Sequence, residues 1–167
     1  MNVKKYLDKI VAIYESGETD FHIGKLVASD EETAVLNMIT TRGFEDGLYI
    51  IKNCDIKRVD LDDKYLQKYA RLFGINKQTF VSDFSPKDDV FTALLNYAFE
   101  NAFVTTFEIE YEDRIIGKIA SVTEETVIVE KIDDYGGSDG ISEIDISSVL
   151  RMICNSGTER LLEALQK

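Results

Sequence analysis

The sequence predicts a mostly β protein with flanking helices, an α+β fold made of two tandem copies of one small domain. Residues 23–73 and 116–166 match when the chain is shifted by 93 positions. Short segments in both copies alternate apolar and polar residues, which is typical of half-buried strands. A Gly-x-x-Asp-Gly turn follows at the same place in each copy, at 43–47 and 136–140. Together these observations favour two small β domains over one larger domain.

The repeat is stronger than composition explains. Identical residues occupy 13 of the 51 shifted positions, where ordinary composition gives roughly one in fifteen. They include Ile-Gly-Lys at 23–25 and 116–118 and Glu-Glu-Thr at 31–33 and 124–126. The period is too long for a solenoid unit. It indicates a duplicated domain, and chance similarity between two β-hairpins is the alternative.

The first copy begins with a predicted helix. Apolar residues recur every three and four positions over 3–16, and Ser16-Gly17 ends the pattern. After the strands, Asp62 is the expected N-cap of a helix that Gly74 closes. The predicted elements are the helix 3–16, strands 20–28, 33–40, 48–52 and 56–61, and the helix 63–73.

The second copy follows a segment without clear periodicity, 75–84, interpreted as a linker. Ser85-Pro86 opens the next predicted helix, 87–102, and Asp88 and Asp89 complement the positive end of its dipole. Thr158 is the expected N-cap of the last helix. The predicted strands are 106–111, 114–122, 126–132, 140–144 and 148–153. The predicted domains are therefore 1–74 and 85–167.

The second copy resembles the start of an Sm-like (LSm) domain. The resemblance lies in the run 106–111, the turn Glu112-Asp113-Arg114 and the pattern Gly117-x-Ile119. It implies two tandem Sm-like barrels, related to SH3-like barrels, each with an N-terminal and a C-terminal helix. Gly24 and Gly117 are then the glycines at which the second strand bends. Gly47 and Gly140 are structural glycines of the later turn, where positive φ is tolerated.

The family's RNA pocket does not carry over to this chain. The positions that resemble the family's Asp and Asn are Asp30 and Ala34 in the first copy, and Thr123 and Val127 in the second. Neither copy has the family's Arg-Gly pair. Sm-like barrels commonly assemble through strand edges, so the resemblance implies that the copies pair through edge strands or the helix 87–102, with a spare edge free to join a second chain.

Composition limits the classes of partner. A formal net charge of −12 repels phosphate backbones, so nucleic acid is possible but disfavoured, and an anionic membrane is not expected. Cys54 and Cys154 are not equivalent in the repeat, and Lys4-Lys5 precede an amphipathic segment rather than an apolar signal core. These features predict a cytoplasmic protein.

No motif in the sequence predicts catalysis, a metal or a cofactor. His22 is the single histidine, and it lies in no recognisable nucleophile motif. The carboxylate pairs Glu31-Glu32 and Glu124-Glu125 fit exposed turns. The acidic stretch 133–140 lacks the ligand order of an EF-hand loop and reads as a hairpin turn. We therefore expect a protein that is not an enzyme.

One segment, 52–77, is net positive in this acidic chain. Tyr65 and Tyr69 lie between its cations, so phosphate contact is an open possibility beside a solvated helix face with internal ion pairs. The first hypothesis is a non-enzymatic protein-interaction or assembly module that self-associates or binds a protein partner. The alternative is an RNA-binding regulator. Its candidate contacts are Lys52, Lys57, Arg58, Lys64, Lys68 and Arg71.

Overall fold

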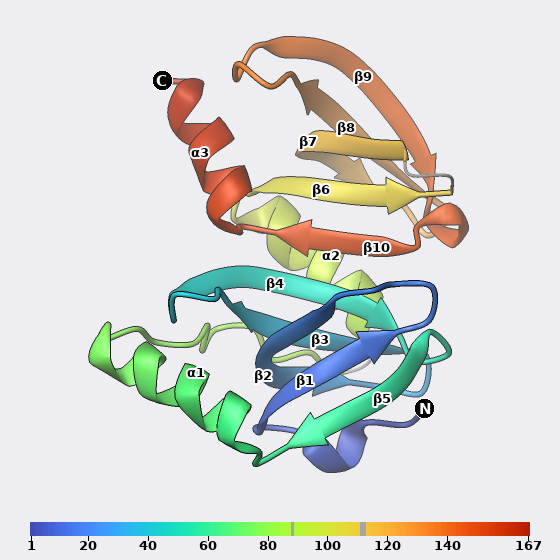
Figure 1. The fold of residues 1–167 in the computed structure, drawn as a ribbon. Coiled ribbons are helices and arrows are strands. Elements are labelled where there is room, and N and C mark those ends of the chain that lie inside the picture. Colours follow the sequence, from blue (N-terminus) through green and yellow to red (C-terminus); the bar gives the residue numbers. More distant parts are fainter. Residues whose placement is uncertain (88, 111–112) are drawn as a thin grey trace. The chain divides into compact units, whose positions relative to one another are not determined.

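The computed structural model describes residues 1–87, 89–110 and 113–167 (Figure 1). The chain divides into two compact units, Met1–Val90 and Phe91–Lys167. Within the described residues, each unit contains five antiparallel strands and a C-terminal helix. The coarse prediction of a mostly β fold is therefore confirmed. The predicted domain limits and linker remain a prediction.

In unit 1 the helix α1 follows a meander of strands. The strand order is β5-β1-β2-β3-β4, so β5 pairs with β1 at one end of the sheet and β4 pairs with β3 at the other. A short 3-10 turn, η1, precedes β1. The elements are η1 (Lys4–Tyr6), β1 (Ile10–Glu15), β2 (Phe21–Ser29), β3 (Thr33–Ile39), β4 (Glu45–Lys52), β5 (Ile56–Leu61) and α1 (Lys64–Ile75).

Unit 2 has the same arrangement of strands. Its order is β10-β6-β7-β8-β9, and each neighbouring pair is antiparallel. The helix α2 begins at the boundary between the units. The elements are α2 (Val90–Glu100), β6 (Val104–Ile109), β7 (Asp113–Val122), β8 (Thr126–Ile132), β9 (Ser138–Asp145), η2 (Ile146–Ser148), β10 (Arg151–Cys154) and α3 (Gly157–Leu165).

The strand register repeats at the shift of 93 residues. Gly24 lies opposite Met38 in unit 1, and Gly117 lies opposite Lys131 in unit 2. The register slips between Leu26 and Ala28 and again at the matching positions 119–121. A bulge changes the local direction of a strand. The sequence repeat therefore coincides with a repeat of hydrogen-bonding geometry.

The bend glycines lie where two strands come very close. A Cβ on Gly117 would lie 2.8 Å from the carbonyl carbon of Glu130 and closer still to its oxygen. A Cβ on Gly24 would lie 2.9 Å from the carbonyl carbon of Asn37. Cβ atoms in proteins do not approach backbone atoms that closely, so only glycine fits where the two strands come together. Gly47 and Gly140 have φ of +78° and +85°, a conformation that glycine adopts without strain.

The C-terminal helix of each unit covers an apolar face of its own sheet. In unit 1, Leu66, Tyr69 and Phe73 of α1 pack against Ala12, Ile23 and Ile39. In unit 2, Leu162 of α3 packs against Val104 and Ile132. Burying these side chains contributes roughly 2 kcal/mol each relative to exposure. The same helical position, Tyr69 or Leu162, is buried in both units.

The prediction of two closed Sm-like barrels is wrong. Each sheet is open, because its strand order is linear and, in the parts of the chain that the structure describes, no pairing joins β5 to β4 or β10 to β9. The close approach at the bend glycines curves the strands without closing the sheet. The sequence pattern marks the bend, but closure depends on pairing between strand ends, for which the sequence carries no signal.

The predicted helix over 3–16 is also wrong. Only Lys4–Tyr6 forms a 3-10 turn, and Ile10–Glu15 is a strand that pairs on both sides, with β2 and β5. Val11, Ala12 and Ile13 are consecutive and all buried, which a strand covered on both faces permits. The expected roles of Asp88, Tyr111 and Glu112 lie outside the described residues.

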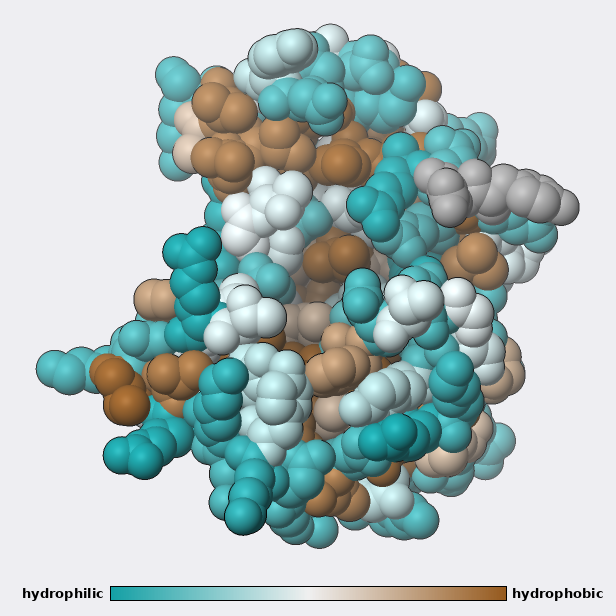
Figure 2. All heavy atoms as spheres, viewed as in Figure 1, coloured by the Kyte–Doolittle hydropathy of each residue, from teal (hydrophilic) through white to brown (hydrophobic). Residues whose placement is uncertain are grey.

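The surface is mainly polar with limited apolar areas. Figure 2 shows hydrophilic residues over most of the visible face, with an apolar patch in the region of α3. Leu161 and Leu165 of that helix are 61% and 51% exposed. Among the described residues, none of the helices has the length and apolar character needed to cross a membrane.

Candidate functional site

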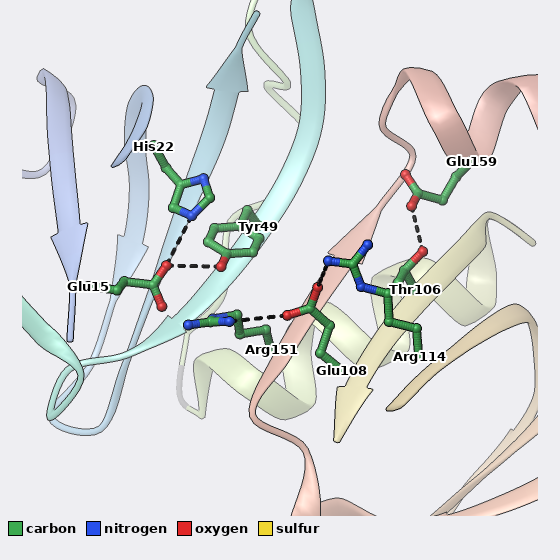
Figure 3. Close-up of polar contacts among 8 residues, drawn as sticks. All are labelled: Glu15, His22, Tyr49, Thr106, Glu108, Arg114, Arg151 and Glu159. Carbon is green, nitrogen blue, oxygen red and sulfur yellow. Dashed lines mark hydrogen bonds and ion pairs between the residues drawn. The ribbon is translucent and has the colours of Figure 1, made fainter. Parts of the chain in front are cut away.

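A buried carboxylate organises the polar contacts of unit 1. Glu15, on β1, is 1% exposed. Its Oε1 accepts a hydrogen bond from the hydroxyl of Tyr49 on β4 at 2.9 Å and lies 3.1 Å from Nε2 of His22 on β2 (Figure 3). The rings of His22 and Tyr49 are 4.4 Å apart. Burial of a carboxylate is costly unless it is hydrogen-bonded, and these contacts supply that compensation.

A carboxylate at the matching position of unit 2 has different partners. Glu108, on β6, is equivalent to Glu15 at the shift of 93. Its oxygens lie 2.9 Å from Arg114 on β7 and 3.3 Å from Arg151 on β10 (Figure 3). The side chain of Glu108 is 13% exposed, whereas that of Arg114 is 66% exposed. The pair with Arg114 therefore reaches the surface, where water and salt weaken it, whereas Arg151 is only 20% exposed and its pair with Glu108 is half-buried.

A third carboxylate fixes the start of α3. Glu159 is 3% exposed and completes a capping box with Ser156, accepting hydrogen bonds from that residue's backbone N–H at 2.9 Å and from its hydroxyl. Its other oxygen accepts from the hydroxyl of Thr106 on β6 at 2.6 Å. The helix is thus hydrogen-bonded at its first turn to the sheet it covers. The expected cap, Thr158, is two residues past the N-cap Ser156.

These three carboxylates all have structural partners within their own unit. His22, the candidate base considered from the sequence, contacts Glu15. Among residues 1–87, 89–110 and 113–167, no three His, Cys, Asp or Glu side chains gather in a way that could hold a metal ion. The acidic stretch 133–140 forms the turn into β9, in which Asp133 accepts hydrogen bonds from the backbone N–H groups of Tyr135 and Gly137.

The six basic candidates lie on three different elements of unit 1. Lys52 ends β4 and is half-buried, Lys57 and Arg58 lie on β5, and the rest lie on α1. Arg58 is bound to Asp60, with Nε 2.8 Å from Oδ1, and this pairing holds the pKa of Asp60 below its usual value. One of the two adjacent cations of β5 is thus already neutralised. The exposed candidates on α1 are Lys64, Lys68 and Arg71.

Aromatic rings lie beside two of these cations. The Arg58 guanidinium lies 4.3 Å from the centre of the Tyr14 ring, and Tyr14 stacks on Phe21 at 4.9 Å. Lys68 lies 5.6 Å and 5.3 Å from the rings of Tyr65 and Tyr69. Such contacts are worth about 0.5–1 kcal/mol at exposed sites. In unit 1, Arg58 and Lys68 are thus each accompanied by aromatic rings.

The strand β9 is the open edge of the unit 2 sheet. It stands at the end of the strand order and pairs with β8, opposite Thr126 to Ile132. Ile146, just past β9, donates its N–H to the carbonyl of Glu125. Antiparallel alternation then turns the backbone groups of Ser142 and Ile144 toward β8. The N–H and C=O groups of Ile141 and Glu143 and the N–H of Asp145 therefore face outward, whereas the carbonyl of Asp145 accepts a hydrogen bond from the Ser148 hydroxyl at 2.7 Å.

The matching strand of unit 1, β4, is buried. Leu48, Tyr49, Ile50 and Ile51 are at most 3% exposed, whereas most of β9 is exposed and Ile141 is 70% exposed. Sequence analysis placed both strands but did not single out β9. The available signal was the replacement of Tyr49-Ile50 by Ser142-Glu143 at the same repeat positions.

Several shallow cavities lie within the units, and two of them are lined by charged side chains. One, of about 450 Å³, is lined in unit 1 by residues of η1, the end of β2 and the segment before α2, among them Lys4, Asp30 and Lys87. The other, of about 430 Å³, is lined in unit 2 by Arg114, Lys131 and neighbouring aspartates. Both mix charges of opposite sign, so neither has the apolar lining and few convergent polar groups of a typical small-molecule site.

Sequence analysis missed the three organising carboxylates. Glu15 lay inside the predicted helix 3–16, and Glu108 was seen only as one acid of an alternating strand. Extending the shift of 93 backward from residue 23 pairs these two identical residues and would have indicated a strand at 10–15. The pairing of Glu159 with Thr106 depends on contact between distant segments, which the sequence does not show.

No protein-family model matches the sequence, and no curated protein matches it significantly. The function is therefore argued from the residues of this chain.

Proposed function

We propose that this is a non-enzymatic cytoplasmic protein-interaction module that binds an extended segment of another polypeptide along β9. The observation that carries the proposal is the exposed edge of β9, with its outward N–H and C=O groups at Ile141 and Glu143 and its outward N–H at Asp145. Unpaired backbone donors and acceptors at a sheet edge accept an added strand. Main-chain hydrogen bonds then supply affinity, and alternate side chains supply selectivity.

The polar clusters support an interaction role over catalysis. Glu15, Glu108 and Glu159 contact side chains of their own unit, and these contacts hold strands or a helix in place. General acid–base chemistry needs a carboxyl or imidazole within reach of a substrate in a cleft. Glu108 and Glu159 instead contribute to the framework of unit 2, which carries β9, and Glu15 contributes to that of unit 1.

Selection from a random peptide library tests the proposal. Octapeptides displayed on phage are panned against the wild-type protein and then against E143P. Proline removes the outward N–H of Glu143 while leaving the ladder bonds of Ser142 and Ile144 to β8. E143T is the matched control, because it removes the same charge and retains the N–H. We expect peptides that bind wild-type and E143T protein and bind E143P at least about fivefold more weakly.

An NMR measurement covers the case in which E143P does not fold. On addition of a selected peptide to the wild-type protein, the amide hydrogens of Ile141, Glu143 and Asp145 should become protected from exchange. Failure to select any peptide, or protection confined to other strands, would overturn the proposed function.

RNA binding through the basic segment is the second candidate. The observation that favours it is the exposed Tyr65, 45% exposed, beside Lys68 on α1. Aromatic rings flanked by cations can stack bases and contact phosphates. The binding of Arg58 by Asp60 and the overall acidic charge work against it.

A filter-retention assay with a single-stranded RNA of mixed sequence separates the two candidates. If RNA is retained at low salt and the charge reversal K57E/R58E abolishes retention, RNA binding through the basic segment is supported. E143K, which reverses one surface charge on β9, away from the basic segment, is the control and should not abolish retention. No retention by the wild-type protein would remove this candidate.

A further inference from the structure

The two faces of β9 differ in a way that specifies what can pair with it. Ile141, Glu143 and Asp145 point to one face and are exposed, while Ser142 and Ile144 point to the other, where Ile144 is 3% exposed. A strand added along this edge would therefore place alternate side chains beside two carboxylates and one isoleucine. Its remaining side chains would meet the rim of the core.

The neighbouring strand β8 extends the outer face. Glu130 lies opposite Ile141, and the half-buried Ile128 lies opposite Glu143. The outer face thus consists of two isoleucines, Ile128 and Ile141, flanked by carboxylates of Glu130, Glu143 and Asp145. Diagonal neighbours on adjacent strands lie within reach of long side chains.

The carboxylates of β9 are available as anions. Asp145 accepts hydrogen bonds from the hydroxyl and the backbone N–H of Ser147, which hold its pKa below the usual value. Glu143 is exposed, and no ion pair to it is present within the part of the chain that the structure describes. Lys131, the nearby cation, instead contacts Asp139 at 3.5 Å.

Resting on the proposed function, we infer that the occupant of β9 is an extended segment of another protein with lysine or arginine at two alternate positions. These cations lie opposite Glu143 and Asp145, and an apolar residue of the same face lies opposite Ile141. Opposite charges directly across strands stabilise pairing, and like charges destabilise it. The edge therefore selects a basic strand and rejects an acidic one.

A second copy of this chain fits the edge less well. Pairing β9 with β9 brings Glu143 and Asp145 near the same carboxylates of the other copy. The other open edge strand, β5, carries Lys57 and Arg58 at consecutive positions, so strand alternation places them on opposite faces. Arg58 is also bound to Asp60. A strand with cations two residues apart satisfies both carboxylates, and β5 does not.

Fluorescence anisotropy with three labelled nonapeptides tests the inference. The first has lysine at two alternate positions, isoleucine at the remaining positions of that face, and valine between. The second replaces each lysine with glutamate, and the third has the composition of the first with its lysines consecutive. Binding is measured to wild-type protein, E143Q and E143K. A fourth peptide, residues 55–62 of this chain, tests β5 as the occupant.

We expect the alternating lysine peptide to bind wild-type protein most tightly. E143Q should weaken it about two- to fivefold and E143K about tenfold, because one cross-strand charge pair is first removed and then reversed. E143K should also gain affinity for the glutamate peptide. Raising the salt concentration to about 0.5 M should weaken the lysine peptide, since exposed charges are screened.

Equal binding of the alternating and consecutive lysine peptides would mean that the acidic protein attracts any basic peptide, whatever the spacing of its charges. That result would overturn the inference. Tightest binding by the 55–62 peptide would assign the edge to a second copy and overturn it as well. If the phage selection yields peptides that depend on the Glu143 N–H but lack basic residues, the inference fails and the proposed function stands. If no peptide depends on that N–H, both fail.

Discussion

Glu15 and Glu108 occupy the same position in two copies of one strand pattern, yet they are balanced in different ways. In unit 1 the carboxylate is enclosed and shares its oxygen with an imidazole and a phenol, His22 and Tyr49. In unit 2 the residues at those places are Ile115 and Ser142, and Glu108 is instead paired with two arginines. One position thus accommodates a buried hydrogen-bonded network or an ion triad in which one arginine reaches the surface, because the strand geometry alone is shared.

The same contrast extends to the strands at the end of each order. The residues of β4 are largely apolar and buried, and the matching residues of β9 include Ser142 and Glu143 and are exposed. The repeat retains the residues that shape the backbone, such as Gly24 and Gly117. It varies the residues whose side chains determine whether a strand is buried or exposed. We infer that shape is common to the units and that binding capacity belongs to the second.

The largest expected effect tests the shared geometry. Gly24→Ala and Gly117→Ala should each destabilise the protein by about 2–4 kcal/mol, since the added Cβ meets the backbone of Asn37 or Glu130. Gly74→Ala is the control, because a Cβ there has no atom within 4 Å and lies in a helix. Urea unfolding monitors the three variants. A loss of stability in one of the two bend-glycine variants and none in the other would show that the bends of the two units are not equivalent.

The carboxylate pair tests the difference directly. Glu15→Ala leaves Tyr49 and His22 without this acceptor in a buried site and should cost about 2–3 kcal/mol. Glu108→Ala removes one exposed ion pair, with Arg114, and one half-buried ion pair, with Arg151, and should cost about 1 kcal/mol, less in high salt. Urea midpoints in low and high salt check both values. Equal losses of stability with equal salt dependence would contradict the difference between the buried Glu15 and the ion-paired Glu108.

The turn after the second strand provides a pH test. The Asp30 carboxylate accepts hydrogen bonds from the backbone N–H groups of Glu32, Thr33 and Val90. Burial alone would raise the pKa of Asp30, but these hydrogen bonds outweigh it and the pKa is lowered. The corresponding stabilisation is present above the pKa of the unfolded chain, about 3.9, and is lost as the pH falls through the folded value.

Thr123 occupies the same turn position in unit 2 and accepts from Glu125 and Thr126 without a titratable group. We therefore expect Asp30→Asn to flatten the decline in melting temperature between about pH 4 and pH 2. Thr123→Ser, the control in the uncharged turn, should leave the shape of that profile unchanged. An identical acid profile for Asp30→Asn and the wild type would count against this role.

The smallest effect concerns a tyrosine pair of unit 1, whose matching residues in unit 2 are Thr158 and Leu162. The Tyr69 hydroxyl donates to the Tyr65 hydroxyl at 2.8 Å, and this hydrogen bond, with burial, raises the pKa of Tyr69 to about 12. The stabilisation is present below the unfolded pKa of about 10 and is lost as pH rises through about 12. Tyr65→Phe should lower the last transition in an absorbance titration, whereas Tyr135→Phe, at an 85% exposed position, should not.

Local patterns in the sequence predicted most strands and helices, because each depends on residues close together in the chain. The hairpins about Glu31-Glu32 and Glu124-Glu125 and the helix after Asp62 lie near their predicted places. Ile10–Glu15 was mistaken for a helix, since a strand buried on both sides lacks alternation. The prediction of a closed barrel was wrong because a curved strand is also compatible with an open sheet. The exposure of β9 could not be predicted, as it depends on what lies beside it.

The helix α3 is held to unit 2 at both of its ends. Hydrogen bonds of Glu159 to Ser156 and Thr106 fix the first turn, and the last turn lies so close to Gly136 that a Cβ there would be 2.9 Å from the carbonyl carbon of Leu165. A helix fastened at both ends has no free end from which to fray, so α3 should open together with the sheet that it covers. In hydrogen exchange, the amides of α3 and of β6 should therefore exchange with similar opening free energies.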